Sequence, residues 1–198
     1  MEKRKVTNVL IVGVGGQGTL LTSRILADVA VRMGFDVKVS EIHGMAQRGG
    51  SVVSQVRFGE KVYSPIIKKG DADLLLAFEK IEAARWLEYL KPDGRVIVNN
   101  ERIDPLPVMS GKVKYPDDIV DRIKAVVANT LMVNATETAI ACGNVKAANV
   151  VLLGVLTAAT GLPVDKVKQA IERNVPSKAL EVNLKAFKAG LELYSTVV

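Results

Sequence analysis

The sequence predicts a doubly wound α/β fold, in which a Rossmann-like, mostly parallel sheet is followed by a C-terminal helical segment. Strand-like and helix-like segments alternate over residues 1–134, and this alternation favours a parallel sheet with right-handed crossovers. A glycine-rich turn closes the first apolar run, and the pattern from about Thr136 onward is helical. We therefore expect residues 1–198 to form one domain, with residues 135–198 packed as helices on the α/β core formed by residues 1–134.

The first elements follow from the spacing of apolar residues and the positions of glycine. Val6–Val12 is rich in β-branched residues and is closed by glycines, as in a buried parallel strand. Leu20–Met33 has the apolar spacing of a helix, and Gly34 ends it. Gly59-Glu60-Lys61 predicts a hairpin turn. The further strands expected in this half are Asp36–Glu41, Val52–Phe58, Val62–Ser64 and Asp73–Phe78.

Helices dominate the second half of the chain. Pro92-Asp93-Gly94 marks a turn after a helix expected over Ile81–Leu90. A proline-containing connector, Asp104–Gly111, precedes a helix that begins at Asp117 with an acidic first turn, as the helix dipole favours. The strands expected here are Arg95–Asn99 and Thr130–Asn134. The final helix carries one apolar stripe, formed by Leu180, Leu184, Phe187, Leu191 and Tyr194.

The composition excludes several classes of protein. The 27 Lys+Arg and 21 Asp+Glu give a net charge of +6, but the basic residues are scattered rather than gathered with aromatics, so we expect no nucleic-acid partner. The best membrane candidate, Ala147–Leu162, is shorter than the roughly 20 residues that cross a bilayer, and we interpret it as a buried helix. The first residues do not form a signal peptide, so we expect a cytoplasmic location and no membrane partner.

The single cysteine, Cys142, limits the chemistry of the chain. One cysteine rules out an intrachain disulfide, a CxxC metal site and an iron–sulfur cluster held by this chain alone. Because Cys142 has no basic or histidine neighbour in the sequence, we interpret it as a buried structural thiol. We expect no metal site in this chain.

Residues 13–18 match the pattern GxGxxG, between a predicted strand and a predicted helix. Gly13 permits a tight turn, Gly15 lets backbone approach a ligand, and Gly18 lets helix and strand pack closely. Glu41 lies near the end of the next strand, where a dinucleotide site has its ribose-binding acid. The turn therefore allows a stand-alone dinucleotide-binding protein, although no dehydrogenase machinery follows it. A purely structural turn is the other interpretation.

A second polar loop, residues 41–51, follows a strand at the edge of the sheet where open α/β folds bind ligands. Arg48 can clamp a carboxylate or phosphate with two hydrogen bonds, and Gly49-Gly50 lets backbone amides approach the same anion. His43 can transfer a proton near neutral pH. Alternatively, this is a surface loop in which Arg48 pairs with Glu41. The candidate catalytic residues are His43, Gln47 and Arg48.

Four segments of the chain together carry a more specific signal. They are residues 13–18, the stretch from Glu41 to Val52, Tyr63-Ser64-Pro65 and Asp71-Ala72-Asp73. In this combination the chain resembles the gamma-type catalytic domain of the 2-oxoacid:ferredoxin oxidoreductases, over roughly residues 6–192. The resemblance implies the oxidative decarboxylation of a 2-oxoacid, for which we expect aryl pyruvates. A gamma subunit acting on pyruvate, 2-oxoglutarate or 2-oxoisovalerate is the alternative.

The resemblance also implies which partners and cofactors take part. A larger alpha subunit is expected to hold thiamine diphosphate, magnesium and [4Fe-4S] clusters, so that this chain binds no cofactor alone and is inactive alone. Electrons pass to ferredoxin through the complex, and the acyl group leaves as its coenzyme A thioester.

The implied active site is composite and lies at the interface with the larger subunit. We hypothesise that Arg48 and the Gly49-Gly50 amides neutralise anionic groups of substrate or coenzyme A, while His43 and Gln47 orient polar groups. A third interpretation is a structural subunit whose loops only support the cofactor of the partner. The residues expected near substrate or cofactor are Gly13, Gly15, Gly16, Gln17, Gly18, Glu41, Gly44, Gly49, Gly50 and Ser51.

Three further segments carry weaker signals. Tyr63-Ser64-Pro65 is expected to end the predicted hairpin strand near the ligand-binding edge. Glu79 and Glu82 stand at a helix start, where we expect them to act as partners of the helix dipole and as surface charges. Asn99-Asn100 ends another strand and could face the ligand crevice.

Overall fold

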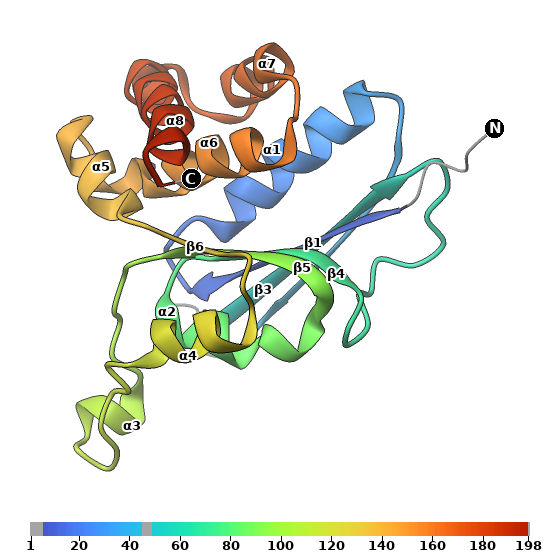
Figure 1. The fold of residues 1–198 in the computed structure, drawn as a ribbon. Coiled ribbons are helices and arrows are strands. Elements are labelled where there is room, and N and C mark those ends of the chain that lie inside the picture. Colours follow the sequence, from blue (N-terminus) through green and yellow to red (C-terminus); the bar gives the residue numbers. More distant parts are fainter. Residues whose placement is uncertain (1–5, 45–48, 198) are drawn as a thin grey trace.

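A six-stranded sheet lies between two layers of helices (Figure 1). The computed structural model describes residues 6–44 and 49–197. The strand order is β2-β3-β1-β4-β5-β6, and β3 alone among these strands runs antiparallel to its neighbours, so the predicted mostly parallel α/β fold is confirmed. The strands are β1 (Thr7–Val14), β2 (Asp36–His43), β3 (Ser51–Gly59), β4 (Ala72–Ala77), β5 (Leu90–Asn99) and β6 (Thr130–Val133).

The helices divide between the two faces of the sheet. In Figure 1, α1 and the C-terminal helices α5 to α8 cover one face, α2 and α4 cover the other, and α3 projects away from the body. Short 3₁₀ turns occupy Leu87–Tyr89 and Val145–Ala147. The helices are α1 (Thr19–Arg32), α2 (Lys80–Arg85), α3 (Leu106–Met109), α4 (Ile119–Val126), α5 (Ala135–Ala141), α6 (Ala148–Thr160), α7 (Val164–Asn174) and α8 (Ser177–Val197).

The apolar helix expected over Ala147–Leu162 is α6, and it lies in the core. Its residues from Asn149 to Thr157 are all buried, because the helix packs against α8 as well as against α1 and α5. Gly154 and Gly190 let α6 and α8 approach closely, since a Cβ at Gly190 would lie 2.1 Å from the carbonyl oxygen of Val151. Across the described residues, no helix has the length and apolar character needed to cross a bilayer.

The predicted hairpin after residue 59 is wrong. Val62–Ser64 forms no strand, and β3 pairs instead with β2 on one side and β1 on the other. Side chains hold the irregular segment: Asp36 Oδ2 accepts a hydrogen bond from the Val62 amide at 2.9 Å, and Arg57 Nη1 donates to the Ser64 carbonyl at 2.9 Å. Because Asp36 begins β2, Tyr63-Ser64-Pro65 lies at the end of the sheet opposite to the ligand-binding edge, which corrects its expected position.

Two further boundaries differ from the predicted ones. The helix expected over Ile81–Leu90 ends at Arg85 and is followed by a 3₁₀ turn. The predicted turn Pro92-Asp93-Gly94 falls within β5, where the register with β4 shifts. The shift accommodates the proline, which cannot donate a backbone hydrogen bond to a regular ladder.

Candidate functional site

The glycine-rich turn connects β1 to α1 at the carboxyl end of the parallel strands. Gly18 precedes α1 with φ 89°, and a Cβ there would lie 2.6 Å from Asn149 Nδ2 of α6. The Gln17 side chain folds back beneath the turn, where its Oε1 accepts from the Val14 amide at 2.7 Å and its Nε2 donates to the Phe78 carbonyl at 3.1 Å. Gln17 thus fastens the end of β1 to the end of β4.

Backbone hydrogen bonds join the second polar loop to the glycine-rich turn. The Gly15 amide donates to the Gly50 carbonyl at 2.8 Å, and the Gly49 amide lies 3.5 Å from the Gly15 carbonyl. The Gly44 amide donates to the Ser51 carbonyl at 3.3 Å. The backbone of Gly15 therefore contacts the second loop, and its predicted approach to a ligand stays a prediction.

A cavity of about 410 Å³, called the crevice below, opens between α1 and the ends of β2 and β3. Glu41 and His43 alternate with Ile42 along β2 and so face the same side of the sheet. Glu41 Oε1 accepts a hydrogen bond from Ser23 Oγ at 3.1 Å, while the His43 side chain is exposed. The lining residues are Gly15, Gly16, Gly18, Thr19, Leu20, Glu41, His43 and Val52.

The structure brings only part of the predicted site together at the crevice. Gly13 lies beneath the turn, where a Cβ would meet Phe78 Cβ at 2.9 Å, and Ser51 points to a different cavity. Gln47 and Arg48 lie outside the described residues, so their predicted roles stay predictions. The crevice itself offers one carboxylate, one imidazole and the amino end of α1, a set that suits a polar or anionic ligand.

The geometry of a dinucleotide site is not reproduced. In such sites the ribose-binding acid belongs to the strand next to the glycine-rich strand. Here β3 stands between β1 and β2, which places the backbone of Glu41 two strand spacings from β1, about 10 Å. The Gly15 amide is also occupied by Gly50. These observations disfavour the stand-alone dinucleotide-binding alternative.

Two buried carboxylates beside the second loop were misjudged from the sequence. Glu79 caps α2, since its Oε2 accepts from the Glu82 amide at 3.0 Å, which agrees with its expected place at the helix dipole. The expectation of surface charges is wrong, because Glu79 is 1% and Glu82 4% exposed. Glu82 Oε2 accepts from Ser51 Oγ at 2.5 Å and its Oε1 pairs with Arg85 at 3.1 Å. The spacing of Glu79 and Glu82 marks a helix start, but no local pattern signals the burial of either carboxylate.

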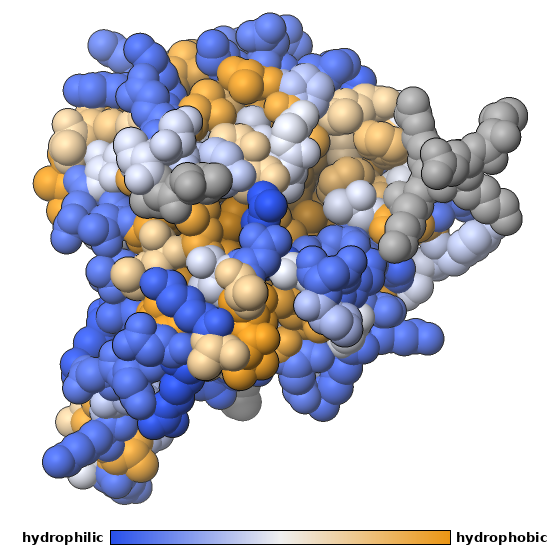
Figure 2. All heavy atoms as spheres, in the orientation of Figure 1, coloured by the Kyte–Doolittle hydropathy of each residue, from blue (hydrophilic) through white to orange (hydrophobic). Residues whose placement is uncertain are grey.

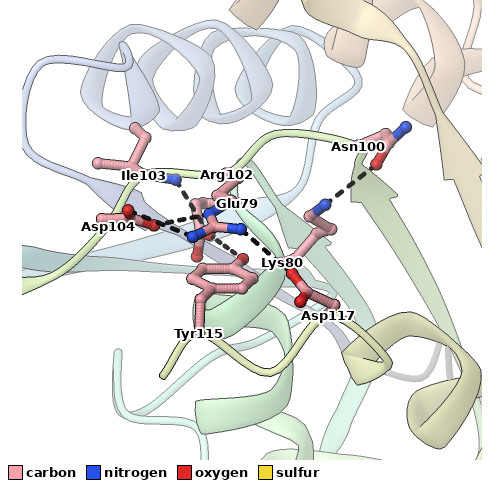
Figure 3. A network of polar contacts seen from close by, with 8 residues as sticks. All are labelled: Glu79, Lys80, Asn100, Arg102, Ile103, Asp104, Tyr115 and Asp117. Atoms are coloured by element: carbon pink, nitrogen blue, oxygen red, sulfur yellow. Dashed lines mark hydrogen bonds and ion pairs between the residues drawn. The ribbon is translucent and has the colours of Figure 1, made fainter. Parts of the chain in front are cut away.

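The Glu79 carboxylate also anchors a network that the sequence did not predict (Figure 3). Its Oε1 accepts from the Tyr115 hydroxyl at 2.6 Å and from the Ile103 amide at 3.3 Å. Burial, together with this hydrogen bond to a carboxylate, raises the pKa of Tyr115 far above its usual range. The Arg102 guanidinium lies 4.3 Å from the centre of the Tyr115 ring. A cavity of about 220 Å³ beside the network is lined partly by Gly49, Ser51, Glu79, Glu82, Arg85, Ile103 and Pro105.

Asn99 does not line the crevice but a separate cavity, so its predicted position facing the ligand crevice stays a prediction. Asn99 is 2% exposed, accepts from the Ala135 amide at 2.9 Å and donates to Thr136 Oγ1 at 3.0 Å. It lines a cavity of about 240 Å³ beside the glycine-rich turn, together with Gln17 and Lys146. Cys142 is buried at the end of α5, as predicted. Among the residues that the structure describes, no group of three or more His, Cys, Asp or Glu could hold a metal ion.

The fold, the glycine-rich turn and the second loop together are features of one family of proteins. The family model described as pyruvate ferredoxin/flavodoxin oxidoreductase matches residues 8–193, nearly the whole chain, and this chain belongs to that family. It is a subunit of a 2-oxoacid:ferredoxin oxidoreductase.

The similarity to the relatives extends over nearly the full length of this chain. Indolepyruvate oxidoreductase subunit IorB of Pyrococcus horikoshii is 43% identical over 195 residues, which are 95% of this chain and 96% of that protein. IorB of Archaeoglobus fulgidus is 43% identical over 187 residues, covering 92% of each chain. The 2-oxoglutarate synthase subunit KorC of Methanothermobacter thermautotrophicus is 32% identical over 202 residues, covering 98% of this chain and 96% of that protein.

Solved structures share the fold. The gamma subunit of the keto/oxoacid ferredoxin oxidoreductase from Geobacter sulfurreducens superposes with a TM-score of 0.72 at 25% identity, covering 96% of this chain and 99% of that one. A 2-oxoglutarate:ferredoxin oxidoreductase chain from Magnetococcus marinus contains the same fold within 32% of its length, with a TM-score of 0.74 at 19% identity and coverage of this whole chain.

Proposed function

We propose that this chain is the beta subunit of an indolepyruvate ferredoxin oxidoreductase and forms one wall of a composite active site. The aryl 2-oxoacid loses carbon dioxide, two electrons pass to ferredoxin, and the acyl group is transferred to coenzyme A. The observation that carries the substrate assignment is the 43% identity, over nearly the full chain, to subunits named for indolepyruvate. The 32% identity to a 2-oxoglutarate subunit is lower.

The metal-binding donors that this chain has support the proposed distribution of cofactors between the subunits. Thiamine diphosphate would supply the carbanion chemistry when held, with magnesium and [4Fe-4S] clusters, by a larger alpha subunit. Four thiolates are needed for a cluster, and this chain has one cysteine, which is buried at the end of α5. Glu41 and His43, in contrast, line an open crevice, where they can bind and orient polar groups of a substrate.

The crevice suits the two kinds of group that the substrates carry. The first amides of α1 and, by the sequence prediction, Arg48 favour the carboxylate of the 2-oxoacid or a phosphate of coenzyme A. Leu20 is 41% exposed at the mouth and Val52 is buried at the wall, which offers apolar surface to an aromatic or aliphatic portion. His43 lines the same crevice, where its imidazole can donate or accept a hydrogen bond.

Filling the crevice tests the proposal. Leu20→Trp places a larger side chain in it and should lower kcat/KM for indolepyruvate or for coenzyme A by about tenfold in the complex reconstituted with the larger subunit. Val31→Trp, 11 residues further along the same helix and 58% exposed, is the matched control and should leave both values unchanged. Unchanged kinetics with Leu20→Trp for both substrates would contradict the assignment of the crevice.

The anion clamp has its own test. Arg48→Ala should lower kcat/KM for the 2-oxoacid or coenzyme A by an amount that corresponds to about 2–5 kcal/mol, the cost of losing a buried charged contact. Arg24→Ala, on α1, serves as the comparison. If the complex that carries Arg48→Ala has the same kcat/KM for both substrates as the unaltered enzyme, the assignment of Arg48 as an anion clamp is wrong.

A further inference from the structure

We propose that residues 104–117, called the arm below, dock this chain on the larger subunit that completes the active site; this inference rests on the proposed function. The arm follows β5 and contains α3, which projects from the body of the molecule (Figure 1). Three large apolar side chains of the arm are exposed: Leu106 by 77%, Met109 by 74% and Val113 by 54%. Figure 2 shows apolar atoms at the end of the same projection, among hydrophilic surroundings.

Ion pairs hold together the two ends of the arm where it leaves the body of the molecule, a part called the root below. Arg102 Nε pairs with Asp104 Oδ1 at 2.7 Å, at the start of the arm, and Arg102 Nη1 pairs with Asp117 Oδ1 at 3.1 Å, at its end (Figure 3). The guanidinium also lies over the Tyr115 ring, and Tyr115 donates to the buried Glu79 carboxylate. A fixed root lowers the conformational entropy that the arm would lose on binding, which is a property of preorganised docking elements.

The position of the root, beside the second loop, supports the larger subunit as the partner that covers the arm. Ile103 and Pro105 line the same cavity as Gly49 and Ser51 of the second loop. Glu79 holds the arm through Tyr115, and Glu82, one turn later on α2, holds the second loop through Ser51. A subunit that covers the second loop would therefore also lie against the root of the arm, so that its contact with the arm is continuous with the proposed composite site.

The charges of the arm define the chemistry of the partner surface. Lys112 and Lys114 are exposed and, among the described residues, form no ion pair, whereas Asp104 and Asp117 are both paired with Arg102. Because one guanidinium neutralises only one of these two carboxylates, the root keeps one negative charge, whereas the apolar side chains further along the arm are bordered by the two unpaired lysines. The complement of this apolar surface is an apolar groove with a carboxylate rim. A second copy of the arm would bring lysines against lysines, which disfavours self-association through this surface.

The decisive measurement is the Kd between this chain and the larger subunit, with and without changes to the arm. Leu106→Asp with Met109→Asp should raise the Kd by about tenfold or more, because buried apolar anchors dominate binding energy. Lys112→Gln with Lys114→Gln, which leaves α3 intact, should also raise the Kd and make association less sensitive to salt. Val31→Asp, exposed at the far end of α1, is the control and should change the Kd by less than about twofold.

The outcomes separate this inference from the proposed function. If the unaltered chain binds the larger subunit and both arm variants bind equally well, the arm inference is overturned and the proposed function stands. If the unaltered chain forms no complex with the larger subunit, both are overturned. Sedimentation of the chain alone should show no dimer that depends on the arm. A dimer of the unaltered chain that the arm variants dissociate would instead assign the arm to self-association. Unchanged thermal unfolding of the variants confirms that they are folded.

Discussion

At the scale of single residues, the pair Ser51–Glu82 is the clearest link between the second loop and the body of the molecule. Double-mutant analysis should give a coupling of about 1–2 kcal/mol in the free energy of unfolding between Ser51→Ala and Glu82→Gln, since a buried carboxylate accepts this hydrogen bond. The exposed pair Lys69–Glu88 is the control and should couple by less than about 0.5 kcal/mol. Additive effects of Ser51→Ala and Glu82→Gln would show that the loop is held otherwise.

Tyr115 gives the stability of the protein a dependence on alkaline pH. A pKa that is raised on folding means that the neutral phenol is favoured in the folded state, so its stabilisation is complete below the unfolded pKa of about 10 and is lost as the pH rises above that value. Tyr115→Phe should lower the free energy of unfolding by about 2 kcal/mol at neutral pH. The difference between the two proteins, measured by denaturant unfolding, should shrink above about pH 10. A constant difference up to pH 11 would contradict this account.

The same residues show where sequence reasoning stops. The glycine-rich turn and the second loop were predicted to lie together, because parallel strands end at a common edge. The burial of Glu79 and Glu82 was not predicted, because their partners Tyr115 and Ser51 are 36 and 31 residues away along the chain. From the sequence alone a carboxylate is expected at the surface, because the buried hydrogen-bond donors that stabilise it are known only from the tertiary structure.

At the scale of elements, the contact between α6 and α8 depends on two glycines. A Cβ at Gly154 would lie 2.4 Å from the Phe187 carbonyl oxygen, and one at Gly190 would lie 2.1 Å from that of Val151. Because backbone atoms cannot yield, Gly190→Ala should lower the free energy of unfolding by about 3 kcal/mol. Lys188→Ala, on the exposed side of the same helix, should change it by less than about 0.5 kcal/mol. Urea unfolding of both variants checks the contrast.

The bounds of helices and strands were predicted correctly where the sequence near each element marks them. The strands β1, β2, β4 and β6 and the helix α1 begin and end within two residues of the predicted bounds, since apolar periodicity and glycines mark them. The failed hairpin at Val62–Ser64 had a strong local turn signal, but β3 already has β1 and β2 as neighbours, so no sheet edge was available to it. Local apolar periodicity predicts that a segment is a strand, but it does not predict which distant strand pairs with it.

At the scale of the whole molecule, the strand order separates this chain from proteins that share its glycine pattern. The antiparallel β3 between β1 and β2 occupies the place where a dinucleotide-binding fold has the strand of its ribose-binding acid, and it carries the second loop onto the Gly15 amide. The topology therefore disfavours a dinucleotide site in the crevice and is compatible with the composite site proposed above. We expect isothermal titration of the isolated chain with NAD(H), NADP(H) or FAD to give no micromolar binding, while the reconstituted complex oxidises indolepyruvate. Saturable dinucleotide binding with a micromolar Kd, lost in Glu41→Gln and kept in the control Glu88→Gln, would show instead that the crevice is a nucleotide site despite its strand order.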